Sequence, residues 1–128
     1  MTKIKIIVGS KTFSAELYDT ATGNAIKEAL PFKSSASTWG DEIYFSVSAD
    51  ADLEPGAQAA VQVGELAYWP SMPAFCIFFG PTPVSTGDQP VAASPVNVFG
   101  KLDQVDLDEL RNIRGGEQIE VAEDNWAI

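Results

Sequence analysis

Aromatic side chains beside glycine and proline are the residues of this sequence whose type and spacing could do chemistry. Trp39 is followed by Gly40 and Trp69 by Pro70, in loop-like stretches where a large aromatic side chain is less often part of a core. Ligand sites are mostly apolar with a few placed polar groups, so these residues predict an aromatic, proline-flanked cleft. The side chains predicted to bind a ligand there are Trp39, Glu42, Tyr44, Tyr68, Trp69, Phe79, Thr82 and Asn97.

Two adjacent carboxylates, Asp41 and Glu42, lie close to these aromatics in the sequence. Neighbouring residues of a strand point to opposite faces, so only one of them could enter a cleft, and this argues against an acid/base pair. A structural acid at the start of a strand is the simpler interpretation. The alternative is a small hydrolase or lyase that uses Glu42 as its base, which rests on one carboxylate alone.

Other reactive side chains have ordinary structural interpretations. Cys76 lies in an apolar run with no base or cation near it in sequence, so we expect a buried, inert thiol. Ser94 and Asn97 could satisfy loop backbone groups or orient a ligand, and we expect Lys101 at the surface. Trp126 is expected to pack or fray rather than to bind.

The composition excludes several classes of enzyme. The 128 residues include no histidine and one cysteine. Ser–His and Cys–His nucleophile pairs, Cys/His zinc sites and 2-His-1-carboxylate iron sites are therefore ruled out. The carboxylates are scattered without a ligand motif, so we expect no metal site and no cofactor.

The charge distribution disfavours two classes of partner. The net charge is −10, and no Lys or Arg occurs between Lys33 and Lys101. Such a chain cannot supply the basic patch that nucleic acids or anionic membranes require. The apolar stretch at the N-terminus is too short for a signal peptide and the longest apolar run, 74–79, too short for a membrane span, so we expect a cytoplasmic protein.

Alternating apolar residues dominate the chain and predict a single, mainly β domain over residues 1–128. We expect Ser34–Ser37 to be a polar linker and Gly80–Pro95 a long functional loop. Helical spacing with N-cap residues predicts two short helices, at 20–30 and from Asp106 to Ile113. The strands are expected at 4–8, 13–17, 43–47, 61–68 (one or two), 75–79, 96–102 and 117–121. These seven or eight strands predict a closed eight-stranded barrel with the helices over its ends.

Three motifs resemble the small prokaryotic cyclophilin-like proteins, a group that shares the cyclophilin barrel and has no established activity. The motifs are Thr38–Phe45, the run from Tyr68-Trp69-Pro70 to Pro83, and Ser94–Lys101. They occur in the family's order and cover nearly the whole chain. The resemblance implies an eight-stranded barrel capped by two helices, which agrees with the strand count.

The resemblance does not carry the prolyl isomerase activity of true cyclophilins. Those enzymes use an arginine on an early barrel strand, where this sequence has Ile43-Tyr44-Phe45, and its own arginines, Arg111 and Arg114, lie on the late helix. The family's pocket histidine corresponds to Val96 here. An apolar groove without a donor for the proline nitrogen cannot lower an amide barrier of roughly 18–20 kcal/mol by much.

Besides the hydrolase or lyase considered above, three functional hypotheses remain. The leading one is a protein that binds a small ligand or peptide in the aromatic cleft without strong catalysis. The alternatives are a weak peptidyl-prolyl isomerase and a structural protein whose exposed aromatics form a homodimer interface. Whether it is an enzyme is left open by the sequence, which favours a binding protein.

Overall fold

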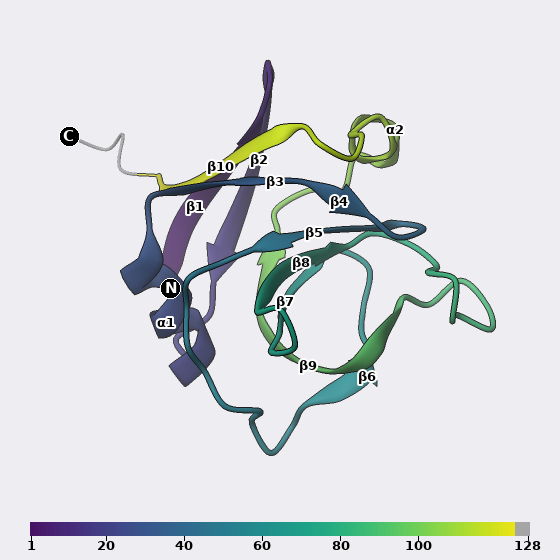
Figure 1. The fold of residues 1–128 in the computed structure, drawn as a ribbon, viewed down its shortest axis with the longest axis horizontal. Coiled ribbons are helices and arrows are strands. Elements are labelled where there is room, and N and C mark those ends of the chain that lie inside the picture. The colour runs from purple at the N-terminus through teal and green to yellow at the C-terminus, as the bar shows by residue number, and fades with distance from the viewer. Residues whose placement is uncertain (125–128) are drawn as a thin grey trace.

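Antiparallel strands surround a common interior, and two short helices lie on opposite sides of them (Figure 1). This computed structural model describes residues 1–124, so Trp126 lies outside the described residues. The helices are α1 (Ala21–Ala29) and α2 (Leu107–Arg111). The strands are β1 (Thr2–Val8), β2 (Lys11–Leu17), β3 (Phe32–Ser35), β4 (Ser37–Thr38), β5 (Glu42–Ser46), β6 (Gln58–Ala60), β7 (Glu65–Trp69), β8 (Ala74–Phe78), β9 (Val91–Leu102) and β10 (Gln118–Glu123).

The mainly β fold with two helices is confirmed, but the closed barrel of eight strands is not. The described residues form ten strands in the order β3-β10-β1-β2-β9-β7-β8-β5-β4, with β6 pairing to β9, and no ladder joins β3 to β4. Both edges belong to one stretch of chain that is interrupted at Ala36. The N–H of Ala36 donates to the carbonyl of Glu117, and its own carbonyl accepts from Gly116, each over 2.8 Å. Here the chain changes partner from β10 to β5, so the backbone connects the two edges.

The inner face of the sheet carries the main apolar core, to which seven strands contribute. At its centre Phe75 stacks on Phe45 with ring centroids 4.8 Å apart and meets Phe99 edge-on at 4.9 Å, geometries that aromatic pairs favour. Phe75 therefore lies at the centre of the core. The two-residue period of each strand places alternate side chains on the opposite face, where a second apolar cluster forms.

The helices begin where the sequence predicts. Thr20 caps α1, with its side chain accepting from the N–H of Gly23 at 3.0 Å, and Asp106 caps α2, accepting from Glu109 at 3.1 Å. Ile26 and Leu110 then bury one side of each helix in the inner core. None of the helices within residues 1–124 is long and apolar enough to cross a membrane.

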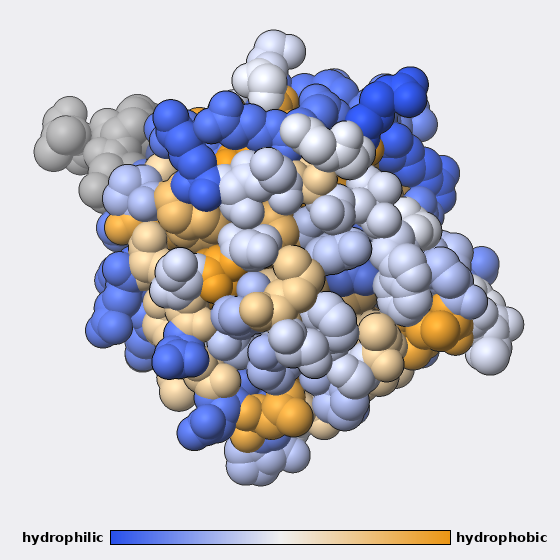
Figure 2. Space-filling model, in the orientation of Figure 1, coloured by the Kyte–Doolittle hydropathy of each residue, from blue (hydrophilic) through white to orange (hydrophobic). Residues whose placement is uncertain are grey.

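Two segments differ from the sequence prediction. Residues 34–37, expected as a polar linker, belong largely to β3 and β4, because their backbone pairs with neighbouring strands, and Ala36 between the two strands is buried in the core. The expected loop 80–95 is shorter, because β9 begins at Val91 and includes Pro95. On the face seen in Figure 2, hydrophobic residues form small patches separated by polar ones.

Candidate functional site

A cavity of about 280 Å³ opens on the outer face of the sheet, beside the second apolar cluster. We call it the outer pocket. Three aromatic side chains and one carboxyl contribute to its lining, and the rest of the lining is small or aliphatic. It is lined by Trp39, Glu42, Tyr44, Trp69, Cys76, Ala92, Ala93 and Val96.

The register of the sheet explains why a hollow lies here. Tyr44 of β5 pairs with Cys76 of β8, Cys76 with Ala67 of β7, and Ala67 with Val98 of β9, so these four residues form one row across the sheet. Directly paired side chains on one face lie next to each other. The two middle residues, Cys76 and Ala67, have small side chains. They leave space above the sheet between the larger side chains of Tyr44 and Val98.

A tight turn between β4 and β5 brings Trp39 and Glu42 to the pocket. The N–H of Trp39 donates to the carbonyl of Glu42 at 2.9 Å, and Gly40 within the turn has φ +61°. A Cβ at Gly40 would lie 3.0 Å from the carbonyl oxygen of Pro81. Only glycine combines this backbone conformation with so close an approach, so the turn is seated against the segment that follows β8.

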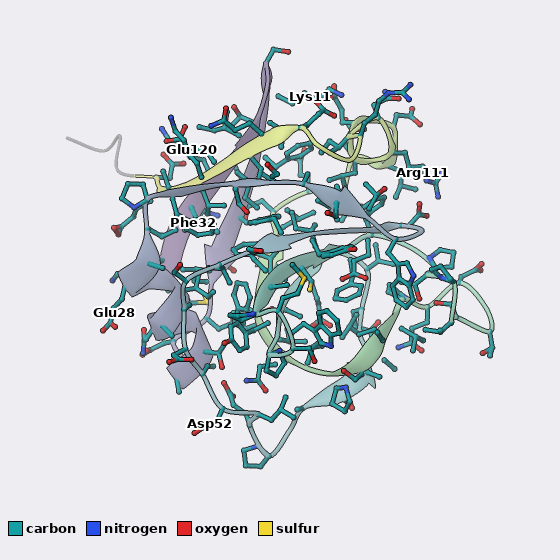
Figure 3. All side chains as sticks on the ribbon, viewed as in Figure 1. Lys11, Glu28, Phe32, Asp52, Arg111 and Glu120 are labelled. Carbon is teal, nitrogen blue, oxygen red and sulfur yellow. The ribbon has the colours of Figure 1, made fainter. Side chains whose placement is uncertain are left out.

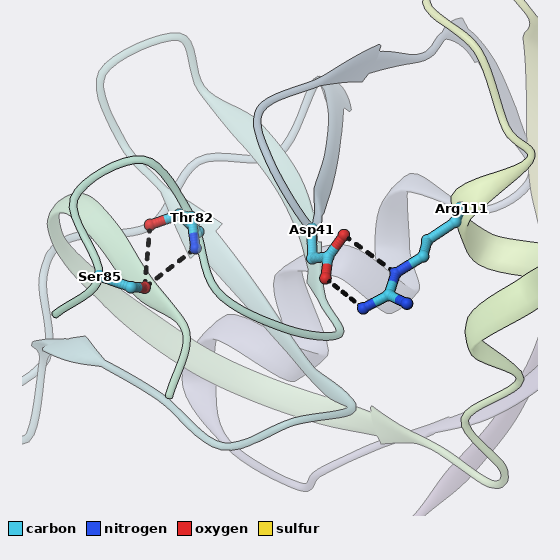
Figure 4. A network of polar contacts seen from close by, with 4 residues as sticks. All are labelled: Asp41, Thr82, Ser85 and Arg111. Carbon is cyan, nitrogen blue, oxygen red and sulfur yellow. Dashed lines mark hydrogen bonds and ion pairs between the residues drawn. The ribbon is translucent and has the colours of Figure 1, made fainter. Parts of the chain in front are cut away.

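Asp41 belongs to the support of the pocket and Glu42 to its lining, which separates the two carboxylates as the strand period predicts. Asp41 forms an ion pair with Arg111 of α2, with 2.9 Å between Nη2 and Oδ2 (Figure 4); Figure 3 shows where Arg111 lies in the whole molecule. Its N–H also donates to the carbonyl of Pro81 at 3.0 Å, and its carbonyl accepts from Phe79 at 3.0 Å. Asp41 is thus the structural acid, and Glu42 is free to face the cavity.

Trp69 is held in place by a side chain from β9. Its indole N–H donates to the hydroxyl of Ser94 over 2.7 Å. Ser94 therefore has neither of the two roles considered for it. Instead, it orients an aromatic wall of the pocket. Because the indole nitrogen is occupied, Trp69 offers the cavity its apolar ring surface.

Glu42 is the one charged residue in the lining, and only 6% of it is exposed. Its burial in apolar surroundings disfavours the charged form and raises its pKa from 4.5 to about 7, against a hydrogen bond from the Cys76 thiol that lowers it. Burial, followed by the negative charge of Glu42 and that same hydrogen bond, raises the pKa of the Cys76 thiol well above its ordinary value. Cys76 is therefore buried and weakly reactive, as predicted from its apolar run.

The structure brings together four of the eight residues predicted for the site, namely Trp39, Glu42, Tyr44 and Trp69. Tyr68 and Phe79 instead belong to the inner core, and the Tyr68 hydroxyl donates to the carbonyl of Ala49 at 2.8 Å. Tyr68 precedes Trp69 on β7, so the two side chains point to opposite faces and cannot share a pocket. Placing Tyr68 and Phe79 in the cleft is therefore corrected.

Thr82 and Asn97 are buried polar residues that hold loops rather than line the pocket. The Thr82 hydroxyl donates to the carbonyl of Val91 at 2.5 Å, and its N–H donates to the Ser85 hydroxyl at 2.9 Å, which closes the loop after β8 (Figure 4). Asn97 donates to the carbonyl of Asp52 at 2.8 Å and accepts from the N–H of Glu54 at 2.8 Å. Thr82 was expected in the site and instead holds its own loop, whereas Asn97 has the first of the two roles considered for it, satisfying the backbone of a neighbouring loop.

Sequence reasoning missed the small residues of the pocket. Cys76, Ala92, Ala93 and Val96 line it, but small side chains carry no chemical signal of their own. The available signal was the alternation on β8, where Cys76 lies on the face opposite Phe75 and Ile77. A small residue on that face of a central strand marks a place where a ligand can approach the sheet.

A second, larger hollow of about 690 Å³ lies beside α2, near the turn between β1 and β2. Its lining is mostly polar and charged, and the Lys3–Asp103 and Lys11–Glu109 ion pairs involve three of its residues. Within residues 1–124, no three metal-binding side chains come together. The larger hollow thus lacks the apolar walls typical of a ligand site.

The fold and the outer pocket define a strand-rich protein that carries a pocket on the outside of its sheet. The sequence matches the cyclophilin-like family over residues 2–122, and the chain belongs to that family. Among curated proteins, no relative matches the sequence. The resemblance of the three motifs is therefore confirmed by a match over nearly the full chain.

A solved structure supports the same assignment. The chain is similar to a hypothetical protein from Archaeoglobus fulgidus, known from a solution structure, with 36% sequence identity and a TM-score of 0.76. The similarity covers 94% of this chain and 93% of the archaeal one.

Proposed function

We propose that this protein binds a small ligand in the outer pocket and does not catalyse a reaction strongly. The observation that carries the proposal is a hollow with aromatic and aliphatic walls and a single buried carboxyl. Ligand sites combine such walls with a few polar groups that fix orientation. At about 280 Å³ the outer pocket is close to the lower end of the usual range, roughly 300 Å³, which favours a small molecule over an extended peptide.

The lining argues for binding rather than for strong catalysis. Glu42 is the one carboxyl in the lining. The other titratable groups there are the thiol of Cys76, whose pKa is raised, and the phenol of Tyr44. Arg111 of α2 is engaged by Asp41. A prolyl isomerase would need a donor aimed at the proline nitrogen, and this lining offers no cationic one.

Ligand-observed NMR with small apolar compounds tests the proposal, using the variant Ala93→Phe. Ala93 is exposed at the lining of the pocket, so a phenyl ring there should obstruct the opening without repacking the core. Ala21→Phe, at the exposed start of α1, is the matched control. Compounds that bind the wild type and the control but not Ala93→Phe support the site. Equal binding to all three proteins would refute it.

The same samples separate the alternatives. A Xaa-Pro peptide that binds and exchanges faster between its cis and trans forms would replace the proposal with weak prolyl isomerisation. Light scattering that shows a dimer, lost in Ala93→Phe, would identify the pocket as part of an interface between two copies.

A further inference from the structure

We propose that the ligand of the outer pocket is a small organic cation, an ammonium group on an apolar body, whose charge lies against Glu42. The inference rests on the proposed function, because it names the chemistry of the ligand for that same site. It follows from three properties of the pocket taken together: the buried carboxyl, the aromatic walls and the absence of a protein cation.

The first property is a carboxyl whose position invites a positive charge. Glu42 is 6% exposed and faces a cavity whose other lining residues are all uncharged. The ion pairs formed within residues 1–124 involve Asp41, Asp103 and Glu109, but not Glu42. An isolated charge in such surroundings is unfavourable unless it is paired, and here the space for the partner is the cavity itself.

The aromatic walls are the second property. Trp39, Tyr44 and Trp69 come from three different strands or turns and meet at one cavity. The face of an aromatic ring attracts a cation electrostatically, tryptophan most strongly, and the attraction is greatest where water is excluded. The same rings also bury the apolar body of the ligand, so one wall serves both parts of an organic cation.

No basic side chain competes for Glu42, and this is the third property. Arg111 is held by Asp41, the residue before Glu42, on the other side of the turn. The titratable groups facing Glu42 are Cys76 from β8 and Tyr44 from its own strand, and neither can supply a positive charge. A cation for Glu42 must therefore come from outside this part of the chain.

Binding of a cation should also displace a proton. The Glu42 carboxyl, whose pKa is raised to about 7, is about half protonated near neutral pH, and a cation binds its charged form. A permanent cation should therefore release about half a proton at about pH 7. Its affinity should be about 30-fold weaker at about pH 5.5 than at about pH 8.5.

The test compares choline with 3,3-dimethylbutan-1-ol, which has the same shape without the charge. Calorimetric titrations in buffers of different ionisation enthalpy measure both affinity and proton release. At about pH 8.5 we expect choline to bind at least about tenfold more tightly than the alcohol, the effect of one favourable charge contact of about 1.4 kcal/mol. Glu42→Gln should abolish the proton release and most of that difference, leaving only the part contributed by the aromatic walls, whereas Asp88→Asn, which removes one exposed acid outside the lining, should retain both.

The outcomes separate this inference from the proposed function. Binding of the alcohol as tightly as choline overturns the cation while leaving a small-molecule pocket in place. Affinity for choline that rises toward acidic pH also overturns it. Failure of both probes, and of the apolar compounds above, overturns the proposed function as well. A lysine-bearing peptide that outbinds butylammonium, with the same loss in Glu42→Gln, supports the cation and identifies a side chain as its source.

Discussion

Replacing Glu42 by glutamine should stabilise the folded protein above neutral pH and leave its stability nearly unchanged in acid. Glu42 is buried, and its pKa rises from 4.5 to about 7 on folding. Between these two pH values the folded chain holds a proton that the unfolded chain has lost. The stability that the protonated carboxyl contributes is therefore complete below about pH 4.5 and is lost as the pH rises to about 7.

The magnitude follows from the same two values. The difference is about 2.5 on the pH scale, and each unit corresponds to about 1.4 kcal/mol, which gives about 3 kcal/mol. Glutamine has nearly the same shape and never becomes charged. The free energy of unfolding of Glu42→Gln minus that of the wild type should therefore increase by about 3 kcal/mol from about pH 4.5 to about pH 8.

Urea unfolding of both proteins across this pH range, followed by circular dichroism, measures the difference. The other acidic residues are shared by the two proteins, so their titration cancels when one curve is subtracted from the other. Asp88→Asn removes one acid from an exposed loop and controls for the change in net charge. A difference that stays constant with pH, or that falls as the pH rises, would refute the reasoning.

Three further substitutions test how the pocket and its supporting loops are held. Asn97→Ala leaves the backbone of the 52–54 segment without its buried partner, so unfolding should become easier by about 2 kcal/mol, measured with urea, and hydrogen exchange should rise in that segment. Gly40→Ala forces a side chain into a φ of +61° and a contact of 3.0 Å, so it should lose about 1–2 kcal/mol and bind probes more weakly, whereas Gly87→Ala, with open space around it, should do neither. Ser94→Ala removes the partner of the Trp69 indole and should lose about 1 kcal/mol, with a shift in tryptophan fluorescence emission.

The elements that depend on short-range pattern could be predicted from the sequence. The hairpin of β1 and β2 follows from the alternation of apolar residues, and both helices begin at the polar caps Thr20 and Asp106. Such signals act within a few residues of chain, so the sequence displays them directly. The polar segment around Ala36 was missed because its strands depend on which neighbours its backbone finds, and that information lies elsewhere in the chain.

The sequence predicted several residue types of the candidate site, but not which face of the sheet each side chain occupies. Trp39 and Trp69 were identified from their glycine and proline neighbours, and both line the outer pocket. Tyr68 was assigned to the same cleft, although one-residue alternation allows only Tyr68 or Trp69 on that face. Deciding which one faces outward requires the register with β8 and β9, which places Trp69 with the small residues and Tyr68 with the core.

The stability effect of Glu42 and the proposed ligand are two consequences of the same arrangement. Packing on the inner face needs nothing from Glu42, since that face is closed by its own aromatic and aliphatic side chains. A carboxyl on the outer face, held among apolar walls, lowers the stability of the empty protein at neutral pH. A cation seated in the cavity would pair with that carboxyl and recover the lost stability, so the wild type should gain more from choline at about pH 8 than Glu42→Gln does. If choline stabilised the wild type and Glu42→Gln equally, the Glu42 carboxyl would make no contribution to choline binding.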